Sequence, residues 1–129
     1  MNDFSKSLAV SASALQAQAT RLRHVSENIS NADTPGYRRK TVSFETTRGP
    51  DAGNGVAVGR VRLDQTALDR VFDPTHPLAD DSGHFEGSNV DLMIEIADAR
   101  EAQRSYEANL KMFDQSRQMS AGLMDLLRK

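Results

Sequence analysis

Residues 31–37 read Asn-Ala-Asp-Thr-Pro-Gly-Tyr, and they contain the first proline and the first glycine of the chain. Thr34-Pro35-Gly36-Tyr37 fits a type II turn, because proline suits the second position and glycine supplies the positive φ that the third position requires. Such a turn ends the helix-compatible sequence that precedes it. We expect a junction between a helix and the next segment, formed by Asn31, Thr34, Pro35, Gly36 and Tyr37.

Glycine and proline divide the rest of the chain as well. All four prolines and seven of the eight glycines lie between Pro35 and Gly87, so two helix-compatible ends flank a turn-rich middle. We predict a mainly α fold in which long N- and C-terminal helices pair as a coiled-coil-like shaft beside a small irregular β-containing insert. Its three parts make one structural unit: an N-terminal axial helix (1–31), an insert with a short β-ribbon (32–88) and a C-terminal axial helix (89–129).

Both predicted helices carry an apolar stripe. In the first helix, large apolar residues recur every seven positions from Leu8 to Ile29. The second helix has a start signal at Ser88-Asn89, and its apolar residues then follow at steps of three and four. We expect helix packing and assembly to depend on eight residues of these stripes: Leu8, Leu15, Leu22, Ile29, Tyr106, Leu110, Phe113 and Leu127.

The helices are long for a chain of 129 residues. About 28 residues before Asn31 span roughly 42 Å, and about 38 residues after Asn89 span roughly 57 Å. A compact chain of this size has a diameter of about 36 Å. The second helix would therefore extend beyond its own globule, and its apolar stripe predicts self-assembly or an obligate partner.

The middle of the chain contains two strand patterns. Val42 and Phe44 alternate with polar residues, and the apolar positions of residues 56–63 keep their alternation only if the phase slips at Gly59. A slip of one residue at a glycine is typical of a β-bulge. We expect residues 51–55 to form the turn of this two-stranded ribbon, which needs a helix beneath it.

The composition limits the possible functions. The net charge is -2, aromatic residues make up 5% of the chain and tryptophan is absent, which is poor material for an enzyme pocket. The chain has no cysteine, which excludes disulfides and thiol chemistry. No apolar run approaches the roughly 18 residues of a membrane span, and residues 1–8 lack the apolar core of a cleavable signal peptide. We expect neither membrane insertion nor classical secretion.

Two polar clusters allow other interpretations. An acidic and histidine-rich group within residues 73–84 could bind a divalent metal, although its prolines favour a kinked loop whose carboxylates stabilise turns. Arg38-Arg39-Lys40, together with Arg60 and Arg62, could bind phosphate groups. Residues 32–88 hold seven basic and nine acidic residues, however, so the broad positive field that drives nucleic-acid binding is missing. Contact with acidic groups of adjacent subunits explains the basic run better, and we expect His24 to be solvated.

No catalytic motif is present. The chain has no nucleophile elbow, phosphate-binding glycine loop or zinc-protease motif, and Glu95 and Glu101 show no pattern of burial. We expect no enzymatic activity, no cofactor and no metal. The helical stripes leave two functions open: a filament subunit, or an adaptor or chaperone that clasps a partner helix.

The junction also carries a family resemblance. Asn28-Ile29-Ser30-Asn31-Ala32-Asp33-Thr34-Pro35-Gly36-Tyr37 resembles the N-terminal signature of the flagellar rod and hook proteins, the axial proteins of the bacterial flagellum. Residues 37–45 resemble the strand that follows this signature. Residues 73–80, 89–91 and 104–109 resemble the C-terminal half of flagellar basal-body rod proteins of the proximal-rod C branch. The resemblance covers nearly the whole chain.

The resemblance implies a structural subunit of the flagellar basal body. Such a subunit is exported by the flagellar type III apparatus without a cleavable signal peptide. It then assembles with copies of itself and with other rod proteins into the periplasmic rod, the drive shaft that transmits torque. The missing pocket and the two long amphipathic ends agree with this implication.

Overall fold

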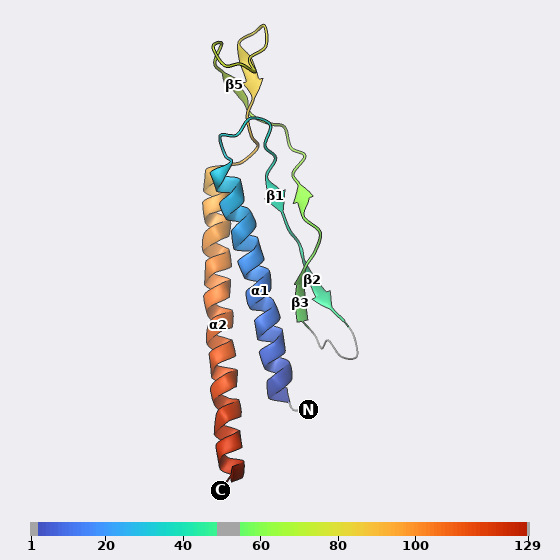
Figure 1. The fold of residues 1–129 in the computed structure, drawn as a ribbon, viewed down its shortest axis with the longest axis vertical. Helices are drawn as coiled ribbons and strands as arrows, with labels where there is room; N and C mark the ends of the chain where they lie inside the picture. Colours follow the sequence, from blue (N-terminus) through green and yellow to red (C-terminus); the bar gives the residue numbers. More distant parts are fainter. Residues whose placement is uncertain (1–2, 49–54, 129) are drawn as a thin grey trace.

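The structure is a computed structural model that describes residues 3–48 and 55–128 (Figure 1). Two helices, α1 (Asp3–Ser30) and α2 (Leu92–Arg128), lie side by side in antiparallel directions, and both chain ends point toward the same end of an elongated molecule. Short strands lie between them in the sequence. The predicted fold class, a helical shaft with a small β-containing insert, is confirmed. Neither described helix is apolar enough over its length to be a candidate membrane span.

Helix α2 begins three residues after the expected start signal. Asp91 is its N-terminal cap, because the Asp91 carboxylate accepts a hydrogen bond from the Met93 amide at 3.0 Å. Asn89 lies before the helix, and its Oδ1 accepts a hydrogen bond from the Arg39 amide at 2.7 Å. The start signal was therefore placed too early, because Asn89 binds a distant loop instead of the first turn of its own helix.

The insert forms a ribbon along α1. Strand β1 (Lys40–Thr41) pairs with β4 (Arg62–Leu63), and β2 (Phe44–Thr47) pairs with β3 (Gly55–Val58), both antiparallel. Between the two ladders the Gly59 amide donates to the Ser43 carbonyl at 2.7 Å, so the regular pairing is interrupted where the phase slip was predicted. The Val56 amide donates to Ser13 Oγ at 3.0 Å and ties the ribbon to α1. Most of the turn expected at residues 51–55 lies outside the described residues.

A second β element was not predicted. Strands β5 (Arg70–Phe72) and β6 (His84–Glu86) pair in a hairpin that projects beyond the helices, at the end opposite the chain termini (Figure 1). Its strands are too short to give an alternation pattern, and its loop contains both prolines of the segment that we expected to be a kinked loop. Stacking of the His76 ring on Phe85, with ring centres 3.9 Å apart, helps to hold this loop against the hairpin.

Candidate functional site: the helix–insert junction

The turn after α1 has the geometry that its residues require. The Tyr37 amide donates to the Thr34 carbonyl at 3.1 Å, and Gly36 has a φ of 76°. The Thr34 hydroxyl donates to Asn31 Oδ1 at 3.1 Å, while the Asn31 side-chain amide donates to the Glu27 carbonyl at 2.9 Å. The last carbonyls of a helix have no partners within the helix. These bonds cap the C-terminal end of α1, where such carbonyls occur.

The same turn binds the segment that leads into α2. The Gly36 amide donates to the Gly87 carbonyl at 3.0 Å, and the Ser88 hydroxyl donates to the Ala32 carbonyl. The Asn89 amide donates to the Tyr37 carbonyl at 3.3 Å. The turn therefore joins the end of α1 to the chain that enters α2.

Asn28 is the centre of the junction and is completely buried. Its Oδ1 accepts hydrogen bonds from the Lys40 amide and the Tyr37 hydroxyl, both at 2.8 Å. Its Nδ2 donates to the Lys40 carbonyl at 2.9 Å and to Glu95 Oε2 at 3.3 Å. One side chain thus links α1, the turn, β1 and α2, and it uses the full hydrogen-bonding capacity of its amide.

Glu95 is also completely buried, which contradicts the expectation that it lies on an exposed helix face. Its Oε1 accepts a charge-assisted hydrogen bond from Arg39 Nε at 2.6 Å. The Arg39 guanidinium also lies 3.5 Å from Asp64 and 3.5 Å from Asp98. A carboxylate can be buried at this position because a guanidinium and the Asn28 amide replace its water.

Burial and pairing act against each other on these groups. Burial lowers the pKa of Arg39, but the hydrogen bonds and charges of Glu95 and Asp64 outweigh it and raise the pKa above its ordinary value. Burial raises the pKa of the Tyr37 hydroxyl. A hydrogen bond from the Thr66 backbone lowers the pKa of Asp64. The guanidinium therefore stays charged throughout the physiological pH range.

The basic run is part of this junction. Arg38 donates to the Asp64 and Thr66 carbonyls at 3.1 and 3.0 Å, and the Lys40 ammonium lies 2.6 Å from Glu27. The Lys40 hydrogen bond lowers the pKa of Glu27 and raises the pKa of Lys40 itself. The side chains of Arg38, Arg39 and Lys40 are therefore all bound within the chain. This argues against a free phosphate-binding surface at these three residues.

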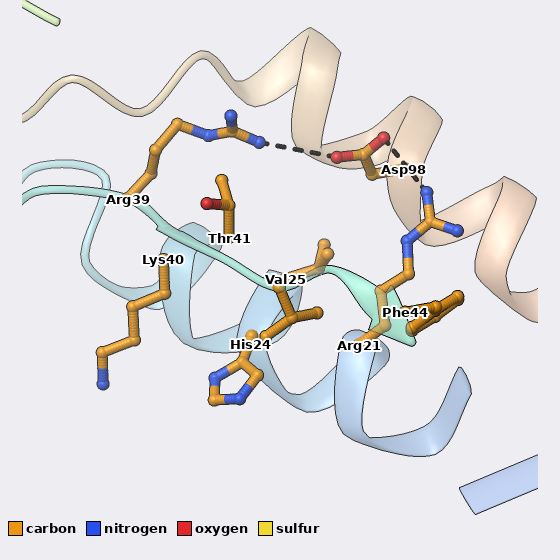
Figure 2. A pocket seen from close by; sticks show the side chains of 9 residues that line it. Arg21, His24, Val25, Arg39, Lys40, Thr41, Phe44 and Asp98 are labelled. Carbon is orange, nitrogen blue, oxygen red and sulfur yellow. Dashed lines mark hydrogen bonds and ion pairs between the residues drawn. The ribbon is translucent and has the colours of Figure 1, made fainter. Parts of the chain in front are cut away.

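A hollow of about 320 Å³ lies between α1, the ribbon and α2. Figure 2 shows the guanidiniums of Arg21 and Arg39 reaching the Asp98 carboxylate from two sides, with Val25 and Phe44 nearby. Asp98 already accepts from both arginines, so these charges are paired within the chain. The buried Nδ1 of His24, which also lines the hollow, has no hydrogen-bond partner among the described residues. The arrangement of the hollow suits the clamping of three chain segments better than the binding of a small molecule.

His24 also lies beside this hollow and corrects another expectation. Instead of being solvated, its side chain is only 11% exposed, and its Nδ1 lies 3.7 Å from a carboxylate oxygen of Glu27. The expectation failed because the sequence does not show that β1 lies beside this part of α1, where Lys40 and Thr41 line the same hollow as His24.

The acidic and histidine-rich loop of the hairpin has a structural arrangement. Asp73 Oδ1 accepts from the Thr75 amide and hydroxyl, and Asp80 Oδ1 accepts from the Ser82 amide and hydroxyl. The Ser82 hydroxyl lowers the pKa of Asp80. Within residues 3–48 and 55–128, no three histidine, aspartate or glutamate side chains are arranged to hold a metal ion. The carboxylates stabilise turns of the loop.

The predicted packing residues have different environments in the single chain. Leu8, Leu15, Leu22, Tyr106 and Phe113 are half-buried. Ile29, Leu110 and Leu127 are exposed, with 38%, 40% and 82% of their surfaces accessible. The interior of the helix pair contains smaller or polar residues, including Ser11, Val25 and Ala102. For the three exposed residues, a role in assembly stays a prediction.

Three junction residues could not be identified from local patterns. Arg39 and Glu95 lie 56 positions apart, and Asn89 is a further partner of the same loop. A single polar residue in a helix is usually exposed to solvent. The one available signal was Asn28, which stands three residues before Asn31 in the signature.

The turn gives a testable prediction. Gly36→Val should lower the free energy of unfolding by about 1–2 kcal/mol, because a β-branched residue is strained at positive φ. No atom lies within 4 Å of an added Cβ, so the backbone conformation alone causes the loss. Gly36→Asn is the matched control and should lose clearly less, since asparagine tolerates this conformation. Urea unfolding measures both, and equal losses would contradict the argument.

Acid should weaken the junction. The carboxyls of Glu27 and Asp64 have pKa values below their ordinary 4.5 and 3.8. Their stabilising contribution is complete above those ordinary values and is lost as the pH falls through the lower folded-state pKa values. The unfolding free energy should therefore decline below about pH 4.5. The double variant Glu27→Gln/Asp64→Asn should show a shallower decline in urea unfolding, and an unchanged slope would contradict this account.

Comparisons with known proteins agree with the geometry. Two family models match the chain: "Flagella basal body rod protein" over residues 8–38, and "Flagellar basal body rod FlgEFG protein C-terminal" over residues 81–126. The first match contains α1 and the turn, apart from the first residues of the helix. The second contains β6 and most of α2. The two matches thus meet at the junction built around Asn28 and Glu95.

Three curated relatives carry the name "Flagellar basal-body rod protein FlgC". The protein from Agrobacterium fabrum is 43% identical over 99% of this chain and 98% of its own length. The Bacillus subtilis protein is 36% identical over 88% of this chain and 91% of its own length. The Salmonella typhimurium protein is 35% identical over 85% of this chain and 87% of its own length. The chain therefore belongs to the family of flagellar basal-body rod proteins FlgC.

Proposed function

We propose that this chain is a structural subunit of the proximal rod of the bacterial flagellar basal body. It self-assembles through its terminal helices into the drive shaft that transmits torque. Its partners are copies of itself, other rod proteins and the flagellar type III export apparatus. It is located in the periplasmic rod, and it acts without catalysis, cofactor or nucleic acid.

The exposed apolar surface of α2 is the observation that carries this proposal. Among its 37 residues, only Glu95 and Ala102 are buried. Eleven of its large apolar side chains are instead 40–82% exposed, and they occur from the first to the last turn of the helix: Leu92, Met93, Ile94, Ile96, Leu110, Met112, Met119, Leu123, Met124, Leu126 and Leu127. A surface of this extent marks a contact with other chains. The lone chain is thus an incomplete structure whose helix is covered in an assembly.

The junction gives the assembly its rigidity. Arg39, Asn28 and Glu95 connect the two helices and the insert through buried hydrogen bonds. A subunit that transmits torque must not rotate internally about its own joints. The buried polar network favours one relative orientation of the helices and the ribbon, because any other orientation leaves buried groups unpaired.

Deletion of the gene tests the proposed function. Cells without it should form no rods and should not swim, and the wild-type gene should restore both. Basal bodies isolated from the restored cells should contain the chain as a stoichiometric component, measured by quantitative mass spectrometry. Its absence from basal bodies that are otherwise complete would overturn the proposal.

The helical adaptor or chaperone that clasps a partner helix is the alternative, because the same exposed stripe could bind one helix of another protein. The localisation experiment separates the two functions. An adaptor stays in a discrete complex with its partner outside the finished rod, whereas a rod subunit remains in basal bodies after detergent extraction.

A further inference from the structure

The insert has two halves of opposite charge. Residues 38–63, which contain the ribbon, hold six basic and two acidic residues, a net charge of +4. Residues 69–87, which contain the β5–β6 hairpin, hold one basic and five acidic residues, a net charge of -4. The small net charge of the whole insert conceals this separation.

Exposed cations remain on the ribbon after the junction is formed. Arg60 and Arg62 are exposed and make no ion pair within the described residues. Their neighbours Val61 and Leu63 are 40% and 50% exposed. We call these four residues, 60–63, the ribbon patch. Arginine beside exposed apolar residues is typical of the centre of a protein interface.

The hairpin offers the complementary surface. An open hollow of about 610 Å³ at its base is lined in part by Leu78, Asp80, Phe85 and Glu86, and also by the cationic Arg70. We call this hollow, with Leu78, Asp80, Phe85 and Glu86 in its wall, the hairpin hollow. Asp80 lies 3.6 Å from Arg70, whereas the exposed Glu86 carboxylate makes no ion pair among the described residues. Phe85 and Glu86 are consecutive residues of β6, so their side chains point to opposite faces of the hairpin, and the Phe85 ring already stacks on His76. The Glu86 carboxylate is therefore the group that can pair with an incoming guanidinium.

These two surfaces lie apart in one chain. The hairpin projects beyond one end of the helices, whereas the ribbon runs alongside α1 (Figure 1). An arginine of the ribbon patch would therefore reach the hollow of another copy, displaced along the long axis, and not the hollow of its own chain.

We propose that the hairpin hollow of one copy receives the ribbon patch of a neighbouring copy. This inference rests on the proposed function, since it supplies a contact between rod subunits. The contact joins two different surfaces, so each copy keeps one surface free for the next copy. A heterologous contact of this kind builds a ring or an open helix, according to the rotation between neighbours.

Charge reversal tests the contact in cells that lack the native gene. Arg62→Glu and Glu86→Arg should each lower the amount of the chain in isolated basal bodies by about tenfold or more, because each places like charges across the interface. Both side chains are exposed, but Glu86→Arg faces Arg70 across the hairpin within the same chain, so circular dichroism checks that each variant folds. The double variant should recover most of the wild-type amount. Normal incorporation of both single variants, or a double variant as poor as either single variant, would overturn the contact.

Cross-linking identifies the occupant of the hollow. The chain has no cysteine, so Arg62→Cys and Glu86→Cys can be expressed together as two separate copies. A bis-maleimide should join them in isolated basal bodies into a product of twice the 14.2 kDa chain mass. The exposed Arg23→Cys replaces Arg62→Cys in the control and should give none. A product with a different rod protein, or an equal yield in the control, would overturn the proposal.

The design separates this inference from the function on which it rests. Failure of the wild-type gene to restore rods would refute the proposed function before any variant is examined. Restoration by the wild-type gene together with silent charge reversals would refute only the contact between hairpin and ribbon.

Discussion

Arg39→Ala should lower the free energy of unfolding by about 3–5 kcal/mol, the range for loss of one partner from a buried ion pair. The substitution leaves Glu95, which is completely buried, without its cation. The remaining hydrogen bond from the Asn28 amide at 3.3 Å cannot neutralise the charge. Urea unfolding followed by circular dichroism measures the loss.

Two further variants test the cause of that loss. Arg117→Ala removes an exposed arginine that lies 3.9 Å from Asp114, and it should cost less than about 1 kcal/mol. Arg39→Met combined with Glu95→Leu should be more stable than Arg39→Ala, because it removes both charges and leaves none buried. A loss no greater for Arg39→Ala than for Arg117→Ala would show that the junction does not depend on this ion pair.

Phe113→Asp and Leu127→Asp should both prevent incorporation into rods, but for different reasons. Phe113 is half-buried, so an aspartate there should lower the free energy of unfolding by about 1.5–3 kcal/mol. Leu127 is 82% exposed, so its replacement should change that free energy by no more than about 0.5 kcal/mol. Quantification of each variant in isolated basal bodies, beside its unfolding curve, separates folding from assembly.

Asp114→Asn is the control for this pair, since the exposed Asp114 follows Phe113 on the helix. It should be incorporated normally. Normal rods with Leu127→Asp would mean that the end of α2 takes no part in assembly. A loss as severe with Asp114→Asn would mean that another face of α2 is the contact surface.

The sequence was sufficient for features that depend on local chemistry. The type II turn follows from Pro35 and Gly36, because few other residues fit those positions. The two helices follow from long stretches that hold no proline and, in α2, only the single glycine Gly122. The interruption of the ribbon follows from the phase of the apolar residues around Gly59. Each of these features is determined by neighbours in the chain.

Other features depend on segments that are distant in the sequence. The neighbours of Glu95 in the sequence give no sign that it is buried. It is buried because Arg39 and Asn28, which are distant in the sequence, bind its carboxylate in the fold. His24 lies beside Lys40 and Thr41 of β1 for a similar reason. The β5–β6 hairpin was missed because three-residue strands carry no readable period. These are effects of tertiary contact that override local preference.

The position of both chain ends at the same end of the molecule determines how it responds to force (Figure 1). Tension between the two ends acts on the α1–α2 contact one turn at a time, as in the opening of a zipper. The 3.3 Å hydrogen bond between the Ser7 and Ser116 hydroxyls lies near this end and separates early. The last contact to separate includes the Asn28–Glu95 hydrogen bond. The chain thus yields gradually to a pull on its termini, while its strongest joint lies farthest from them.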